Sequence, residues 1–109
     1  EGKGDAMTVE ELKALLDAGE PPFVLDVREP LELQTAPFPF PVHHVPMREV
    51  PQHLDEVPRE GTVVVACRSG QRSATVVQFL RKSGVPGAVN LEGGILAWSS
   101  RIDPSVPRY

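Results

Sequence analysis

The sequence predicts an α/β fold with a mainly parallel sheet, and three observations support this. Short apolar runs alternate along the chain with segments whose apolar residues recur at helical spacing. One of these runs, residues 23–27, is apolar enough for a strand that is buried on both faces. Glycine and proline separate the segments, as expected at the turns between strands and helices. Strands that alternate with helices in this way build a parallel sheet.

The first helix and the first strand have clear local signals. Thr8 and Glu11 form the capping-box pattern, in which a hydroxyl precedes a carboxylate by three positions. Apolar residues at helical spacing follow, and Gly19 ends the predicted helix. Residues 23–27 then predict a strand, and residues 30–33 predict the start of a short helix.

The middle of the chain is rich in proline. In residues 35–41, three prolines alternate with two phenylalanines, which excludes a regular helix or a central strand. We expect an extended loop there, with its rings packed on the body of the protein. Residues 42–45 predict a strand that Pro46 ends, and residues 50–57 carry apolar positions at helical spacing.

The second half repeats the alternation of strand and helix. Residues 62–66 predict the central strand, and an apolar helical pattern runs from Arg72 to a cap at Gly84. Residues 88–91 predict a further short strand, and residues 95–100 a last helix that follows two glycines.

Composition narrows the function classes. We expect residues 1–109 to form one domain, with a linker-like start at 1–6 and an irregular tail at 101–109. A formal net charge of −4 argues against nucleic acid as a partner, and no apolar run is long enough to cross a membrane. The single cysteine excludes an internal disulfide and favours a reducing compartment, so we expect a cytoplasmic protein.

That cysteine, Cys67, lies where the central strand ends and a helix is about to begin. The backbone N–H groups of a first helical turn have no partners within the helix, and the helix dipole is positive there. Such a loop binds an anion and favours a thiolate over a thiol. Arg68 and Arg72 add positive charge that can hold an oxyanion, and Gly70 supplies backbone freedom. The sequence therefore predicts that Cys67 is a nucleophile.

Three segments together resemble the signatures of the rhodanese-like domain. They are Phe-Val-Leu-Asp-Val-Arg-Glu-Pro at 23–30, Cys-Arg-Ser-Gly-Gln-Arg-Ser-Ala at 67–74, and Val-Asn-Leu-Glu-Gly-Gly-Ile-Leu-Ala-Trp at 89–98. The resemblance implies a five-stranded parallel sheet with helices on both sides. It also implies a sulfurtransferase whose cysteine carries sulfane sulfur as a persulfide, with no cofactor. The tail at 102–109 resembles the ending of such domains fused behind adenylyltransferases that serve ubiquitin-fold sulfur carriers.

On this reading, Cys67 takes sulfur from a donor such as thiosulfate or a protein persulfide and passes it to a thiol, to cyanide or to a sulfur-carrier protein. The expected persulfide-binding loop comprises Arg68, Ser69, Gly70, Gln71, Arg72 and Ser73. Ser73 fits either a helix cap or a ligand group. Asp26 and Arg28 are expected to support the loop as an ion pair or a hydrogen-bonded strut.

Two other functions compete with sulfur transfer. A rhodanese-like fold can act as a binding or regulatory module without turnover, although the cysteine and its loop are present here. A cysteine phosphatase or an arsenate reductase is the other alternative. Cysteine phosphatases with a related loop place one more residue between cysteine and arginine than the four found here between Cys67 and Arg72. We expect no metal site, because His43, His44 and His53 have no acidic or cysteine cluster beside them.

Overall fold

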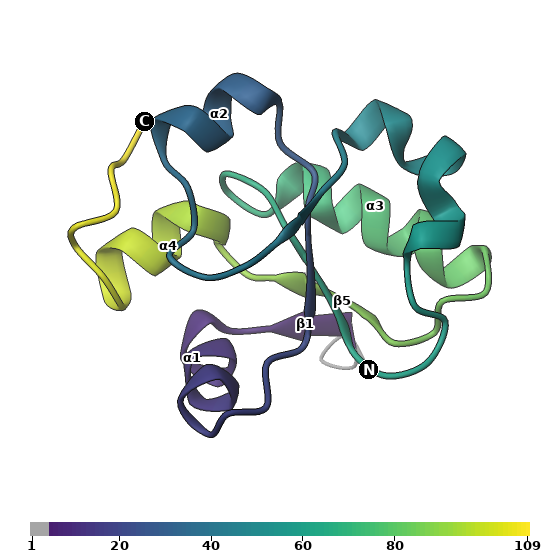
Figure 1. The fold of residues 1–109 in the computed structure, drawn as a ribbon, viewed down its shortest axis with the longest axis horizontal. Helices are drawn as coiled ribbons and strands as arrows, with labels where there is room; N and C mark the ends of the chain where they lie inside the picture. The colour runs from purple at the N-terminus through teal and green to yellow at the C-terminus, as the bar shows by residue number, and fades with distance from the viewer. Residues whose placement is uncertain (1–4) are drawn as a thin grey trace.

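A computed structural model describes residues 5–109 and arranges five parallel strands in one sheet (Figure 1). The strands are β1 (Ala6–Met7), β2 (Phe23–Asp26), β3 (His43–His44), β4 (Val63–Ala66) and β5 (Ala88–Leu91). Their order is β1-β5-β4-β2-β3, and every neighbouring pair is parallel. The predicted α/β class is confirmed, and β4 is the central strand as predicted. The carboxyl ends of all five strands therefore lie at the same edge of the sheet.

The helical segments between the strands cover the sheet. They are α1 (Val9–Asp17), α2 (Pro30–Thr35), the 3-10 segment η2 (Met47–Glu56), α3 (Gln71–Lys82) and α4 (Gly94–Arg101). The predicted capping box of α1 is confirmed. The backbone N–H of Thr8 donates to the Glu11 carboxylate at 2.8 Å, and the Glu11 N–H donates to the Thr8 hydroxyl at 3.1 Å.

Alternation along the strands divides the core into two layers. On one face, Val63 and Val65 of β4 pack with α3 and η2. On the other, Val64 and Ala66 pack with α1 and α4. Figure 1 shows these two groups of helices on opposite sides of the sheet. Cys67 belongs to the layer under α3.

The proline-rich loop packs its rings on the second layer, as predicted. Phe38 is 7% exposed, and its ring lies 5.1 Å from that of Phe40. Phe40 in turn meets Trp98 of α4 edge to face, with the ring centres 5.1 Å apart. Beyond α4 the chain has neither helix nor strand, yet Val106 is buried against the same layer.

Two segments differ from the pattern that the residues suggested. A helix was expected over 50–57, whereas the 3-10 segment η2 begins at Met47 and has non-helical backbone at His53. Pro51 lies inside it and has no N–H to donate, which favours short turns over a continuous α-helix. β1 begins at Ala6, the last residue of the expected linker-like start. Residues 1–4 of that start lie outside the described residues.

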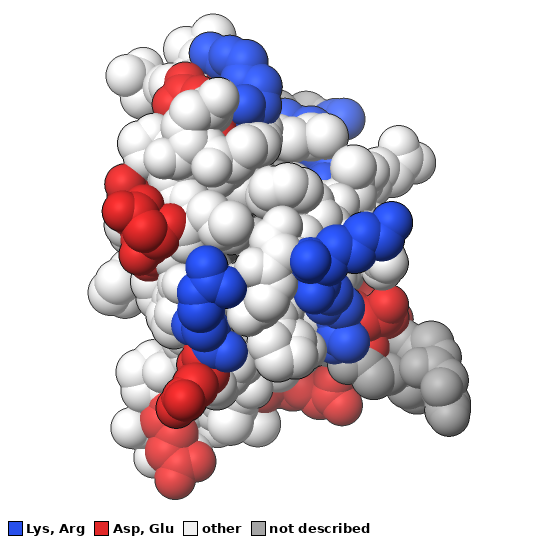
Figure 2. Space-filling model, turned by 90° about the vertical axis from the view of Figure 1, so that its right-hand side faces the viewer, with Lys and Arg blue, Asp and Glu red and all other residues white. Residues whose placement is uncertain are grey.

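Charged residues of both signs share the face over η2 and the end of α3, with white surface between them (Figure 2). This face therefore carries no continuous basic surface of the kind that binds a nucleic acid backbone. None of the helices within residues 5–109 has the length and apolar character needed to cross a bilayer.

Candidate active site

The end of β4 and the start of α3 fix the position of Cys67. The strand ends at Ala66, the loop turns through Gly70, and α3 begins at Gln71. Gly70 has a φ of +101°, where an L side chain is strained, and a Cβ there would lie 3.2 Å from the backbone N of Gly93. This tight turn directs the first amides of α3 back toward the cysteine. We call residues 67–73 the Cys67 loop.

Two backbone N–H donors and one hydroxyl surround the Cys67 sulfur. The backbone N–H of Gly70 lies 3.1 Å from Sγ, the N–H of Ser73 lies 3.4 Å away, and the Ser73 hydroxyl lies 3.2 Å away. Cys67 is only 1% exposed, but the neighbouring loop residues Arg68 and Ser69 are exposed. The sulfur thus lies directly beneath a solvent-facing loop and next to N–H and O–H groups. The Cys67 side chain is also part of the apolar core.

These donors stabilise a thiolate. Burial is the largest single influence and on its own raises the pKa of Cys67. The hydrogen bonds from the Ser73 hydroxyl and from the N–H groups of Ser73, Gly70 and Ser69 together outweigh it, so the pKa of the thiol is lowered. The environment therefore favours the nucleophilic form of sulfur.

Ser73 is held by a residue that the sequence analysis missed. Its hydroxyl donates to Oδ1 of Asn90 at 2.5 Å, and Nδ2 of Asn90 donates to the carbonyl of Gly70 at 3.0 Å. A serine hydroxyl carries one proton, so it can donate to Asn90 or to an ionised Cys67 but not to both. Gly70 caps α3, and Ser73 is the third residue of that helix, so Ser73 is not its N-cap. Its side chain instead contacts the Cys67 sulfur.

We predict that Ser73→Ala raises the pKa of Cys67. It removes a hydrogen bond to a charged group, so the midpoint of alkylation rate against pH is expected to rise by about one pH unit. Iodoacetamide measures this directly, because the chain has one cysteine. Ser69→Ala is the matched control, since its exposed side chain is lost while its N–H is kept. A wild-type midpoint at or above that of a free thiol would contradict the donor geometry.

The two arginines of the loop have different partners. Arg72 makes two 2.8 Å hydrogen bonds to the carboxylate of Glu32 in α2. This hydrogen-bonded pair lowers the pKa of Glu32 to about 2 and raises that of Arg72. Arg68 instead stacks on the ring of Tyr109, 5.1 Å from its centre, and donates to the backbone carbonyl of that residue. The structure thus separates two side chains that the sequence analysis treated together.

Asp26 and Arg28 form a fully buried ion pair at the end of β2. Nε of Arg28 donates to the Asp26 carboxylate at 3.0 Å and Nη2 at 2.8 Å, while Nη1 donates to the carbonyl of Ala36 at 2.9 Å. Nη1 also donates to the hydroxyl of Tyr109 at 3.1 Å. Arg28 therefore joins β2, the loop after α2 and the chain near Tyr109. Its supporting role for the Cys67 loop remains a proposal.

His43 and His53 share Glu56 as a partner, whereas His44 contacts the main chain. His43 lies 2.7 Å from a Glu56 oxygen, His53 lies 2.6 Å from the other oxygen of Glu56, and His44 lies 2.6 Å from the carbonyl of Arg28. Within residues 5–109, no group of three or more histidine, cysteine, aspartate or glutamate side chains is arranged to hold a metal ion.

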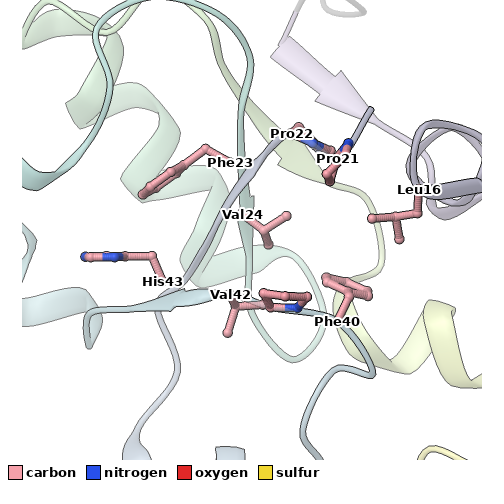
Figure 3. A pocket seen from close by; sticks show the side chains of 9 residues that line it. Leu16, Pro21, Pro22, Phe23, Val24, Phe40, Val42 and His43 are labelled. Atoms are coloured by element: carbon pink, nitrogen blue, oxygen red, sulfur yellow. The ribbon is translucent and has the colours of Figure 1, made fainter. Parts of the chain in front are cut away.

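A groove of about 470 Å³ is lined by residues outside the Cys67 loop (Figure 3). Phe23 and Val24 line it from the start of β2, with Leu16 from α1 and Val42 and His43 from the region of β3. Since the strands are parallel, the start of β2 and the end of β4 lie at opposite ends of the sheet. The groove and the Cys67 loop are therefore separate features.

Comparisons with known proteins identify the family of the chain. The family model of the rhodanese-like domain matches residues 8–101. The chain is 34% identical to the putative sulfurtransferase YtwF of Bacillus subtilis, over 85% of this chain and 88% of that protein. It is 32% identical, over 98% of its length, to the probable adenylyltransferase/sulfurtransferase MoeZ of Mycobacterium tuberculosis. The chain spans 28% of that relative and 23% of its maize counterparts.

Solved structures have the same architecture. A rhodanese-like domain protein of Staphylococcus aureus superposes with a TM-score of 0.82 and 31% identity, covering 96% of this chain and 98% of that one. A protein of Staphylococcus saprophyticus gives a TM-score of 0.79 with 33% identity. Both share the five-stranded parallel sheet with its helices. The relatives named sulfurtransferases support sulfur transfer as the general chemistry. On the match of residues 8–101, the chain belongs to the rhodanese-like domain family.

Proposed function

We propose that the protein is a sulfurtransferase that carries sulfane sulfur on Cys67 as a persulfide. One observation carries the proposal: two backbone N–H groups and one hydroxyl converge on a single sulfur atom at 3.1–3.4 Å. Donors fixed in this way stabilise negative charge without reorganising during the reaction. The same donors would serve the thiolate before transfer and the persulfide after it.

The first step would take sulfur from an anionic donor such as thiosulfate. The Cys67 thiolate attacks the outer sulfur, a sulfur–sulfur bond forms to Cys67, and the bond within thiosulfate breaks. Sulfite leaves with the electron pair, so the charge balances. In the second step, a thiol or cyanide attacks the terminal sulfur of the persulfide, and Cys67 leaves as a thiolate. The chemistry is divided into two displacements, as in other covalent catalysis.

The relatives favour a second class of acceptor. Several relatives are named adenylyltransferase and sulfurtransferase together, and the matched region is about a quarter of their length. A sulfur-carrier protein is therefore a candidate acceptor besides a small thiol. A single free cysteine fits a reducing compartment, so the expected cytoplasmic location stands as part of the proposal.

Mass spectrometry after incubation with thiosulfate tests the function. We expect wild type to gain one sulfur atom and to lose it to cyanide as thiocyanate, whereas Cys67→Ser gains none. Serine is similar in size to cysteine, so the variant is expected to fold like wild type. Its failure to gain sulfur would then be due to the missing thiol. Folded wild type that stays unmodified with both thiosulfate and a low-molecular-weight persulfide would favour a binding module instead. Turnover of an aryl phosphate would favour the phosphatase.

A further inference from the structure

Arg68 and Arg72 differ in how much of their charge is free to meet a ligand. Arg72 gives two hydrogen bonds to Glu32, and that carboxylate offsets its charge. Arg68 has no carboxylate side chain within 4 Å among residues 5–109, and it is exposed beside Cys67. A guanidinium has five N–H donors, and the hydrogen bond of Arg68 to the main-chain oxygen of Tyr109 leaves others to face solvent. An anion that approaches the loop therefore meets an Arg68 whose charge no Asp or Glu side chain of the described residues offsets.

Arg68 is ordered by a residue far along the chain. Its guanidinium lies 5.1 Å from the ring centre of Tyr109 and also donates to the Tyr109 carbonyl. The ring is fixed in turn, because its hydroxyl accepts from Arg28 at 3.1 Å and donates to Glu32 at 2.7 Å. Arg28 is fully buried, so its hydrogen bond ties the Tyr109 ring, on which Arg68 stacks, to the core.

We propose that Tyr109 is a positioning residue that holds Arg68 at the mouth of the Cys67 loop, where Arg68 receives the anionic group of the sulfur donor. A long side chain that is ordered before binding loses less conformational entropy when the ligand arrives. Stacking leaves the edge of the guanidinium free to donate to an oxyanion. This role rests on the proposed sulfur transfer for its substrate. The property that can be measured without transfer is the preference of Cys67 for anionic reagents.

The rates of Cys67 alkylation by iodoacetate and iodoacetamide isolate this preference. Both reagents form the same carbon–sulfur bond and release iodide, but only iodoacetate is an anion. The ratio of the two rates cancels changes in thiol pKa and in loop exposure, which a merely structural role would alter. We expect Arg68→Gln and Tyr109→Leu each to lower the ratio about fivefold, in line with the loss of one nearby charge in a solvated site. Tyr109→Phe keeps the ring but loses the hydroxyl that fixes it, so its ratio should lie between those of wild type and Tyr109→Leu.

A double variant makes the test decisive. In an Arg68→Gln background, Tyr109→Leu should lower the ratio no further, because its effect acts through Arg68. Arg101→Gln is the charge control, since it removes one positive charge from the end of α4, where that arginine pairs with Glu10. A Tyr109→Leu protein with the wild-type ratio would overturn the proposal. So would an equal loss with and without Arg68, or an equal loss in Arg101→Gln.

The assay does not depend on sulfur transfer, so the two proposals fail separately. If thiosulfate loads wild type, Arg68→Gln and Tyr109→Leu should also raise the KM for thiosulfate about fivefold with little change in kcat, as for lost binding of an anion. If loading fails while the alkylation ratios behave as expected, the transfer proposal falls and the positioning role stands. Unchanged alkylation ratios in a protein that loads normally would refute the role of Tyr109 alone.

Discussion

Replacing Gly94 with alanine is expected to displace the Cys67 loop and to lower the free energy of unfolding by about 3 kcal/mol or more. An alanine Cβ at this position would lie 2.4 Å from the carbonyl oxygen of Cys67 and 2.5 Å from that of Arg68. Both contacts are with backbone, so no side chain can turn aside. The same carbonyls accept from Ile95 and Leu96 at 3.0 and 3.1 Å, and these bonds would break.

Gly19→Ala measures the cost of left-handed backbone without a steric clash of the new Cβ. Gly19 has a φ of +73°, similar to the +57° of Gly94, but a Cβ there meets nothing within 4 Å. Its substitution is expected to cost only about 1–2 kcal/mol, the penalty of left-handed backbone alone. Urea unfolding measures both variants, and the alkylation midpoint of Cys67 reports the loop. Equal losses in the two variants, with an unchanged midpoint, would show that α4 does not hold the loop.

Arg28→Met is expected to lower the free energy of unfolding by about 3–5 kcal/mol, because it leaves a buried carboxylate without its partner. Asp26 and Arg28 are both 0% exposed, and their contact is 2.8 Å long. Methionine keeps part of the apolar volume of the arginine stem, so the loss reports mainly on charge and hydrogen bonds. The substitution also removes the donors that hold Ala36 and Tyr109.

A double-mutant cycle tests the cause. In an Asp26→Asn background, Arg28→Met strands no buried carboxylate and removes an unpaired guanidinium, so it should cost clearly less there than in wild type. Arg48→Ala provides the exposed comparison, since its pair with Glu29 is open to solvent and contributes little to stability. Equal losses from Arg28→Met with and without the Asp26 charge would mean that packing, not the ion pair, stabilises this corner.

The active-site thiol could be predicted because its signals are local. A run of valines, one cysteine, a glycine and a helical pattern follow one another directly, and each constrains the backbone next to it. The loop geometry needs little more than this sequence. Ser73 could be placed near the sulfur for the same reason, although its role as ligand rather than cap required coordinates.

The partners of the loop could not be predicted in the same way, because they come from distant parts of the chain. Glu32 reaches Arg72 from α2, Asn90 reaches Ser73 from β5, and Tyr109 reaches Arg68 from the tail. No periodicity links these positions. Asn90 had one weak signal, since it is the polar residue in an otherwise apolar strand.

Short strands and helices were also hard to predict from the sequence. β1 has two residues without β-branched side chains, and it is a strand because β5 pairs with it. In η2, helical spacing of apolar residues was the correct signal for burial of Val50, but it did not distinguish an α-helix from 3-10 turns around Pro51. In both cases tertiary contacts outweighed local preference.

The bonds from Ile95 and Leu96 to the backbone of Cys67 and Arg68 have a consequence during synthesis. A ribosome adds about 5–20 residues each second. The cysteine leaves it well before α4 does, and Asn90 also emerges later. For a time on the order of seconds, the growing chain holds the Cys67 loop without α4, which binds its backbone, and without Asn90, which holds Ser73. The contacts that fix the loop backbone and Ser73 are therefore complete only after Asn90 and α4 have been made.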